Sequence, residues 1–185
     1  MTTKSITSSE AASEIFLERG YLEAIPVLSQ HAAQEIWEEV GVSLELNGPG
    51  RFKTHLLLPI LDKLVRNAKI LRVVCSALGS ENILVWLSDW CIKQAHSQGF
   101  YSWHQDSTYT GMTEPEKALT VWLALTPSMP KSGCLRVVPR SHKWGQFAHE
   151  LRPSDENMLS RGQHIVVDEK IADFTHEAVD LILQS

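Results

Sequence analysis

The chain has 185 residues, which is enough for one domain with a substantial core and too few for two comfortable ones. Hydrophobic residues make up 43% of it and charged residues 21%, which is typical of a globular protein. The formal net charge of −5 argues against nucleic acid or an anionic membrane as the main partner, because both favour basic surfaces.

The cysteines and the N-terminus indicate a cellular compartment. The three cysteines, at positions 75, 91 and 134, are widely spaced without a CxxC pair, which favours buried free thiols in a reducing environment. The opening MTTKSITSSEAASEIF lacks the apolar run of a signal peptide, and apolar runs such as 83–87 are too short to span a bilayer. We expect a soluble cytoplasmic protein. The terminal LQS is no peroxisomal tripeptide, but a longer chain could carry one, so that location stays open.

Residues 1–80 are predicted to be mainly helical. Ser29 is a suitable N-cap for a helix, Pro59 suits the first turn of a short second one, and Gly41 to residue 51 reads as a loop. Asn67 is expected to cap a third helix that Gly79 ends. The apolar positions at helical spacing are Ala33, Ile36, Trp37 and Val40, then Leu61, Leu64 and Val65, and then Ile70, Leu71, Val74, Ala77 and Leu78.

Residues 81–185 show strand signals instead. Apolar residues alternate or cluster over five short segments: 83–87, 119–125, 135–138, 164–167 and 179–183. Prolines and a Ser-Gly turn separate these segments. Helices followed by strands, without βαβ alternation, predict a single α+β domain whose helical part packs on an antiparallel sheet or barrel.

The stretch SWHQD, residues 102–106, places His104 two positions before Asp106. The 8 histidines and 22 acidic residues predict about one such pair by chance, so the pair alone does not distinguish a metal site from two polar neighbours. On a strand the two side chains would share a face. With a distant histidine they would form the 2-His-1-carboxylate triad of Fe(II), whereas zinc prefers a closed tetrahedron. The aromatic residues nearby suit an enclosed site or plain core packing equally well: Phe100, Tyr101, Trp103 and Tyr109.

Longer blocks of sequence resemble a known family. WCIKQAHSQGFYSWHQD, ALTVWLAL and SGCLRVVPRSHKWG occur in the order and spacing of the phytanoyl-CoA dioxygenase family of non-haem Fe(II)/2-oxoglutarate oxygenases. The last block is similar to the family's N/S-G-x-L-x-V-x-P-G-S-H. The helical lead-in segments LERGYLEAIPVLS and KTHLLLPILDKLVRNAKIL extend the resemblance over nearly the whole chain. It implies a double-stranded β-helix core (a cupin-like jelly-roll), Fe(II) as cofactor and 2-oxoglutarate as co-substrate.

The resemblance also implies roles for particular residues. His104 and Asp106 match two iron ligands on the first core strand. The residues matching the co-substrate site are Lys93, Thr120 and Trp122, and those bordering the substrate are Trp103 and Tyr109. A solvated surface lysine and inward barrel packing remain alternatives for the co-substrate residues. His142 closes a structural block and is not expected to bind metal.

Two local departures from the family pattern bear on the site. Arg140 stands where the family has glycine, so it must adopt a standard conformation or accept strain. Thr110 replaces an aromatic residue, which would widen the substrate pocket.

A larger departure concerns the end of the chain. In the family, a strand resembling AVDLILQ precedes the distal histidine ligand and an arginine that binds 2-oxoglutarate, and this chain ends at Ser185 before either. His149, His164 and His176 all precede the expected ligand position. We expect an incomplete jelly-roll with weak Fe(II) binding and little turnover, in a protein whose complete form hydroxylates a small organic molecule. The alternative is a non-catalytic paralogue or isoform that binds a small molecule or a protein.

Overall fold

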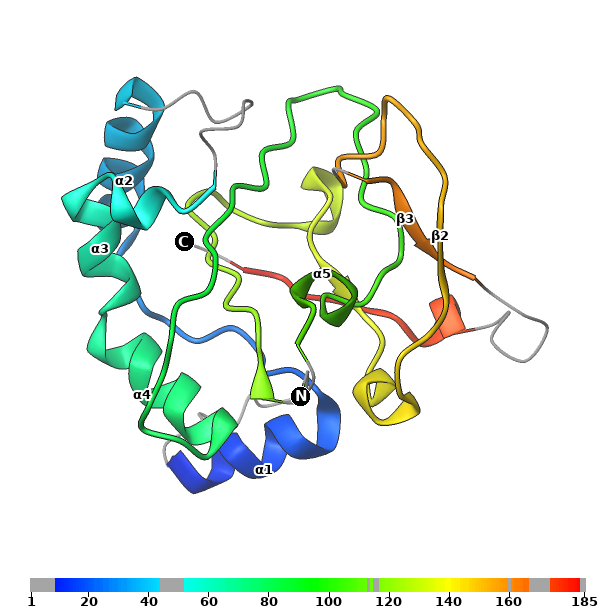
Figure 1. Ribbon diagram of the computed structural model, residues 1–185. Helices are drawn as coiled ribbons and strands as arrows, with labels where there is room; N and C mark the ends of the chain where they lie inside the picture. The colour runs from blue at the N-terminus through cyan, green and yellow to red at the C-terminus, as the bar shows by residue number, and fades with distance from the viewer. Residues whose placement is uncertain are drawn as a thin grey trace.

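The structure is a computed structural model that describes residues 9–43, 52–112, 114, 117–159, 161–166 and 174–183. The helices of the first half are α1 (Ser9–Arg19), α2 (Gln30–Ser43), η2 (Thr54–Leu56), α3 (Pro59–Val65) and α4 (Ala68–Leu78). In Figure 1 α2, α3 and α4 follow one another down one side of the molecule, and α1 crosses beneath them. The helical first part is therefore confirmed. The predicted start of the loop at Gly41 was wrong, because residues 41–43 belong to α2, and its residues 44–51 lie outside the described residues.

The predicted helix ends are confirmed by their capping contacts. Ser29 Oγ accepts a hydrogen bond from the Ala32 N–H at 3.2 Å, and Pro59 occupies the first turn of α3. Asn67 Oδ1 accepts the Lys69 N–H at 2.9 Å, and Gly79 ends α4 in the left-handed region at φ 61°. These signals could be predicted because each cap acts within a few residues of itself.

The buried centre joins the helical part to the later segments. It consists of Ile36 and Val40 of α2 and Leu61 of α3. Partly buried apolar residues pack against it: Leu28, Trp37, Leu58, Ile60, Leu64, Trp90, Ile92 and Leu125. Trp90 also donates its indole N–H to the buried Thr54 hydroxyl at 3.0 Å. Trp90, Ile92 and Leu125 of the later part thus lie against the helices, but none of the three belongs to a described strand.

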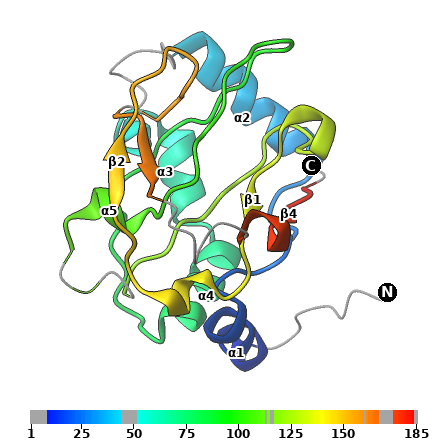
Figure 2. The ribbon, with the colours of Figure 1, turned by 90° about the vertical axis from the view of Figure 1, so that its right-hand side faces the viewer.

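The described strands form two antiparallel ribbons. One pairs β1 (Arg136–Val137) with β4 (Val179–Asp180), and the other pairs β2 (His149–Leu151) with β3 (Gln163–Ile165). Figure 2 shows the two ribbons on different sides of the molecule. Three predicted strand segments overlap them, although residue 167 of the segment 164–167 lies outside the described residues. This mixture of helices and strands agrees with the α+β class, while the double-stranded β-helix remains a prediction.

The strand prediction was wrong for segments 83–87 and 119–125. Neither segment contains a named strand. Leu84 is 86% exposed and Val121 is 49% exposed. Alternating hydrophobicity indicates which face of a strand is buried, but a β-ladder also needs a second strand to pair with. Next to segment 83–87, the Ser88 carbonyl accepts a hydrogen bond from the Lys53 N–H at 2.8 Å, and Lys53 lies outside any strand.

The RSHKW turn attaches α1 to the rest of the chain. Arg140, which precedes η5 (Ser141–Trp144), has φ 67°, so it accepts the left-handed conformation that glycine would adopt without strain. Its N–H donates to the Arg19 carbonyl at 2.8 Å, and its guanidinium lies 2.9 Å from Glu18. Glu18 also pairs with Lys143. The hydrogen bond and charge of Lys143, followed by the charge of Arg140, hold the pKa of Glu18 below its ordinary value.

His142 has a structural role in the same contact. Its Nε2 donates to the Leu17 carbonyl at 3.0 Å, near the C-terminus of α1. Gly20 follows α1 at φ 82°, and a Cβ there would lie 2.3 Å from His142 Nδ1. A glycine is therefore required where α1 meets this turn.

The three cysteines are free thiols, as predicted, but burial differs from the expectation: Cys134 is buried, Cys75 is half-buried and Cys91 is exposed. Among the described helices, none is both long and apolar enough to cross a membrane.

Candidate functional site

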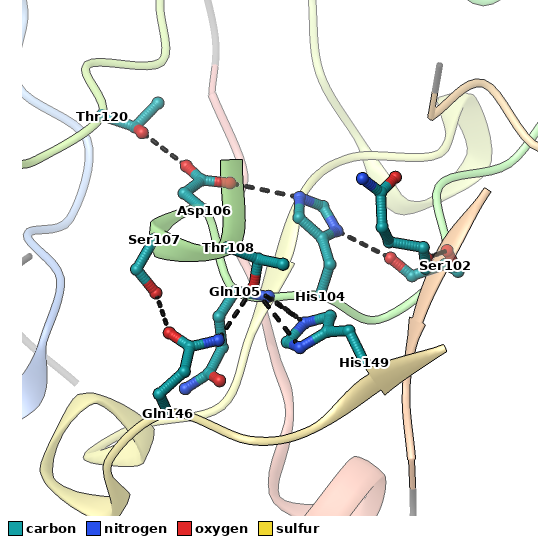
Figure 3. A network of polar contacts seen from close by, with 10 residues as sticks. Ser102, His104, Gln105, Asp106, Ser107, Thr108, Thr120, Gln146 and His149 are labelled. Carbon is teal, nitrogen blue, oxygen red and sulfur yellow. Dashed lines mark hydrogen bonds and ion pairs between the residues drawn. The ribbon is translucent and has the colours of Figure 1, made fainter. Parts of the chain in front are cut away.

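His104 and Asp106 converge in the structure. His104 Nε2 lies 3.1 Å from Asp106 Oδ1 (Figure 3). Neither residue lies on a named strand, and Asp106 is the residue that precedes α5 (Ser107–Thr110), with φ −58° and ψ −33°. The predicted strand placement is therefore replaced by a turn. The chain bends at Asp106, and this bend brings the carboxylate back to the imidazole.

The hydrogen bonds of His104 indicate its tautomer. Nδ1 lies 2.8 Å from the Ser102 carbonyl, which can only accept, so Nδ1 carries a proton. Nε2 then faces a carboxylate, which also only accepts. The contact is favourable when Nε2 is protonated, or when a cation lies between the two groups.

The pKa shifts agree with an attraction between the charged forms. Burial lowers the pKa of His104, but its bonds to Asp106 and to the Ser102 carbonyl, together with the charge of Asp106, outweigh burial and raise it. The bond with His104 lowers the pKa of Asp106 against the effect of burial, and the Thr120 hydroxyl adds to the lowering. The His104 side chain is 21% exposed and that of Asp106 60%, so the pair lies at the protein surface and solvent reaches it.

Thr120 is the predicted co-substrate residue that the structure places at this pair. Its hydroxyl donates to Asp106 Oδ2 at 2.5 Å, which leaves Oδ1 directed at His104. Asp106 is thus oriented by one partner on each oxygen. Its contact with 2-oxoglutarate remains a prediction.

A buried polar group supports the backbone just before His104. The Ser102 side chain donates to the Gln163 carbonyl and accepts from Asn157 Nδ2 at 3.0 Å. Ser102 is 8% exposed and Gln163 is 4% exposed. The Ile165 N–H donates to the Trp103 carbonyl at 3.0 Å. The sequence alone does not identify these residues, because serine, asparagine and glutamine at such separations form no local pattern.

The remaining predicted residues have other partners or no described contact. Lys93 Nζ donates to the Gly133 carbonyl at 2.8 Å and lies 6.0 Å from the centre of the Tyr101 ring. The Arg136 guanidinium lies 5.7 Å from the centre of the Trp103 ring.

Trp122 is half-buried. The backbone of Tyr109 belongs to α5, but its side chain lies outside the described part of the structure.

Of the three histidines that precede the expected ligand position, His149 binds neighbouring backbone groups, and the other two lie in separate elements. His149 Nε2 accepts the Gln105 N–H at 3.1 Å, and its Nδ1 contacts the Phe147 carbonyl at 2.9 Å. His164 lies on β3, and His176 lies in η6 (Phe174–Glu177). Within the described ranges, no group of three or more His, Cys, Asp or Glu side chains is placed to hold a metal ion.

Comparisons with known proteins match most of the chain. The family model of phytanoyl-CoA dioxygenase matches residues 25–183. The mouse phytanoyl-CoA dioxygenase domain-containing protein 1 is 35% identical over 103 residues, which cover 55% of this chain and 35% of the mouse protein. An Arabidopsis thaliana phytanoyl-CoA dioxygenase is 32% identical over 98 residues, covering 53% of this chain and 34% of that protein.

A solved structure is similar over a larger share of the chain. The apo form of ThoJ, a non-heme monooxygenase, matches with a TM-score of 0.73 and 27% identity, and the match covers 94% of this chain and 65% of that one. The chain spans about a third of the length of the curated relatives that it matches.

Proposed function

Because the chain belongs to the phytanoyl-CoA dioxygenase family, we propose that His104 and Asp106 are two protein ligands of an iron centre in an Fe(II)/2-oxoglutarate-dependent dioxygenase. The whole protein would hydroxylate a small organic molecule. The family and the similarity to a non-heme monooxygenase support an oxygenase-type enzyme. The observation that carries the proposal is the 3.1 Å approach of His104 Nε2 to Asp106 Oδ1, with Nδ1 of His104 bound to a carbonyl.

The donor atoms of this pair fit ferrous iron. One imidazole nitrogen and one carboxylate oxygen belong to the ligand set of non-haem Fe(II) oxygenases. A metal-binding histidine commonly donates its second ring N–H to a carbonyl, as His104 does to Ser102. When Nε2 is unprotonated, it and the Asp106 carboxylate are both acceptors, and a bound cation would remove their repulsion. Two protein donors hold iron less firmly than three, so we expect weak binding by the 185-residue chain.

Bound iron together with 2-oxoglutarate supplies the activation of O₂ for insertion into a C–H bond. Thr120 holds Asp106 Oδ2 and so keeps Oδ1 directed at the metal position. For Lys93 we propose a contact with a carboxylate of 2-oxoglutarate, which is a stronger acceptor than its present partner, the Gly133 carbonyl. Trp122 would border the co-substrate, and the proposed substrate neighbours are Trp103 and Tyr109. The double-stranded β-helix is part of the same proposal.

Iron binding by single-residue variants tests the ligand assignment. Anaerobic calorimetric titration with Fe(II) should give weak binding to the parent chain and no binding to Asp106→Ala. The matched control is Asp62→Ala, which removes an exposed carboxylate on α3 that pairs with Arg66. It should bind as the parent does.

Two results would change the proposal. Equal Fe(II) binding by the parent and by Asp106→Ala would contradict the assignment of Asp106. Conversion of 2-oxoglutarate to succinate by the 185-residue chain at a substantial rate, lost in Asp106→Ala, would support the ligands but contradict the expectation of little turnover.

A further inference from the structure

The residues around Asp106 are bonded to a segment distant in sequence. We call residues 104–108 the ligand loop and residues 145–149 the clasp segment, which leads from η5 into β2. In Figure 3 the side chains of Gln146 and His149 reach from the clasp segment toward the ligand loop. Their bonds hold the residues on both sides of Asp106.

Gln105 binds the clasp segment with its side-chain amide. Oε1 accepts the Phe147 N–H at 2.7 Å, and Nε2 donates to the Gly145 carbonyl at 2.8 Å. One side chain therefore satisfies a donor and an acceptor of the opposing backbone, much as a neighbouring strand would. This fixes the position of the residue between His104 and Asp106.

His149 binds the same residue through its backbone. The Gln105 N–H donates to His149 Nε2 at 3.1 Å, so Nε2 carries no proton. Nδ1 then carries the proton and donates to the Phe147 carbonyl at 2.9 Å. Both ring nitrogens are thereby engaged, and the imidazole is held as a neutral acceptor aimed at the ligand loop.

Gln146 binds the first turn of α5, directly after Asp106. Its Nε2 donates to Thr108 Oγ1 at 2.8 Å, and its Oε1 accepts the Ser107 hydroxyl. Asp106 is thus flanked by Gln105 on one side and by Ser107 on the other, and each is bonded to the clasp segment. A carboxylate that is 60% exposed gains its fixed position from these neighbours.

We propose that the clasp segment positions the metal-binding pair, with His149 and Gln105 as positioning residues. This inference rests on the proposed function of His104 and Asp106. A ligand pair must be held to within about 0.5 Å by bonds that lock its supporting residues. Outer partners of metal ligands typically change metal affinity by about 10- to 100-fold when they are removed.

The test compares two replacements of His149. His149→Phe keeps a ring but leaves the Gln105 N–H without its acceptor, whereas His149→Gln places an amide oxygen near the position of Nε2. Gln105→Leu breaks the clasp from the opposite side. The matched control is His142→Gln, which alters a neighbouring histidine that contacts α1 and not the ligand loop.

Three NMR measurements on each 185-residue variant give the readouts. Hydrogen exchange of the Gln105 amide reports the bond to His149. The ¹⁵N shifts of the His104 ring report its tautomer without metal. Selective broadening of residues 104–106 by Mn²⁺ reports binding at the pair and tolerates weak affinity.

The parent and His142→Gln should show a protected Gln105 amide and the same Mn²⁺ midpoint. His149→Phe and Gln105→Leu should raise this midpoint about tenfold and shift the His104 ring nitrogens. His149→Gln should restore most of the parent behaviour. Unchanged His104 shifts and an unchanged midpoint in His149→Phe would overturn the proposal, as would an equal loss in His142→Gln.

The failure of the proposed function has a separate signature. If Mn²⁺ does not broaden residues 104–106 of the parent selectively, the metal assignment fails. The positioning role then stands or falls on the metal-free His104 shifts, which His149→Phe should move and His149→Gln should restore.

Discussion

Residues 140–144 and residues 145–149 follow one another in sequence, but they attach two different regions by different chemistry. The first group holds α1 with exposed ion pairs, in which Arg140 and Lys143 contact Glu18. The second holds the ligand loop with the amide of Gln146, the imidazole of His149 and the backbone groups that the Gln105 side chain binds. Exposed ion pairs contribute little and are screened by salt, whereas hydrogen bonds are directional. At α1 these charges add to the hydrogen bonds that the Arg140 N–H and the His142 ring donate to α1 carbonyls, whereas the ligand loop is held by directed hydrogen bonds.

The largest effect is expected beside the ligand loop, at Ser102. Ser102→Ala would leave the half-buried Asn157 amide and the buried Gln163 carbonyl without the hydroxyl that joins them. We expect a loss of about 2–3 kcal/mol in the free energy of unfolding, because unpaired buried polar groups are costly. Urea unfolding measures it. The exposed Ser97→Ala is the control and should change stability by less than about 0.5 kcal/mol. Equal small losses in both variants would show that the buried hydroxyl is dispensable.

A steric change at α1 should have the next largest effect. Gly20→Ala adds a Cβ 2.3 Å from His142 Nδ1 at φ 82°, so it should lower the free energy of unfolding by about 2 kcal/mol. His142→Ala in the same chain removes the clash but leaves the backbone strain, so the double variant should recover part of the loss. Thermal unfolding of the parent, the two single variants and the double variant gives the coupling free energy between Gly20 and His142. Strictly additive losses would mean that the two residues do not meet.

The contrast between these regions also shows which features the sequence could predict. The caps Ser29 and Asn67 and the first-turn Pro59 act locally, and the structure has all three where they were predicted. The strand prediction for 83–87 failed because a ladder depends on a partner that no local pattern identifies.

The site shows the same difference between local signals, which the sequence predicts, and contacts between distant residues, which it does not. A family motif identifies His104 and Asp106 two residues apart in the sequence, and the structure brings the two side chains together. Their supporting partners lie far away in sequence. Ser102 and Asn157 are 55 residues apart, and Gln105 and His149 are 44 apart. A single sequence offers no periodicity or spacing that links such polar residues, so only the folded chain reveals them.

Protonation of the His104–Asp106 pair provides a smaller, pH-dependent effect. The raised pKa of His104 gives stability that is complete below its ordinary value of 6.5 and is lost as pH rises through the folded value. The lowered pKa of Asp106 gives stability that is present above its ordinary value of 3.8 and is lost as pH falls through the folded value. The free energy of unfolding of the metal-free parent should therefore exceed that of Asp106→Asn by the largest amount between pH 3.8 and 6.5.

Urea unfolding of the parent and Asp106→Asn across this range measures the difference. The contact of Glu18 with Arg140 and Lys143 supplies the comparison. The lowered pKa of Glu18 makes its contribution to stability fall only as pH falls, so this contact should lose no stability as pH rises through the histidine range. A pH-independent difference between the parent and Asp106→Asn would contradict the coupling of His104 with Asp106.

The smallest effect is expected at Arg140, where strain and charge oppose each other. Arg140→Gly should relieve the left-handed backbone at φ 67°, which stabilises the chain by about 0.5–1 kcal/mol, and it also removes the contact with Glu18. Salt screens the ion pair but not the backbone strain. The variant should therefore gain stability relative to the parent as the NaCl concentration rises, whereas the difference between His149→Phe and the parent should not depend on salt. Thermal unfolding at low and high NaCl compares them. The same salt dependence at both positions would show that charge, and not directed hydrogen bonding, also holds the ligand loop.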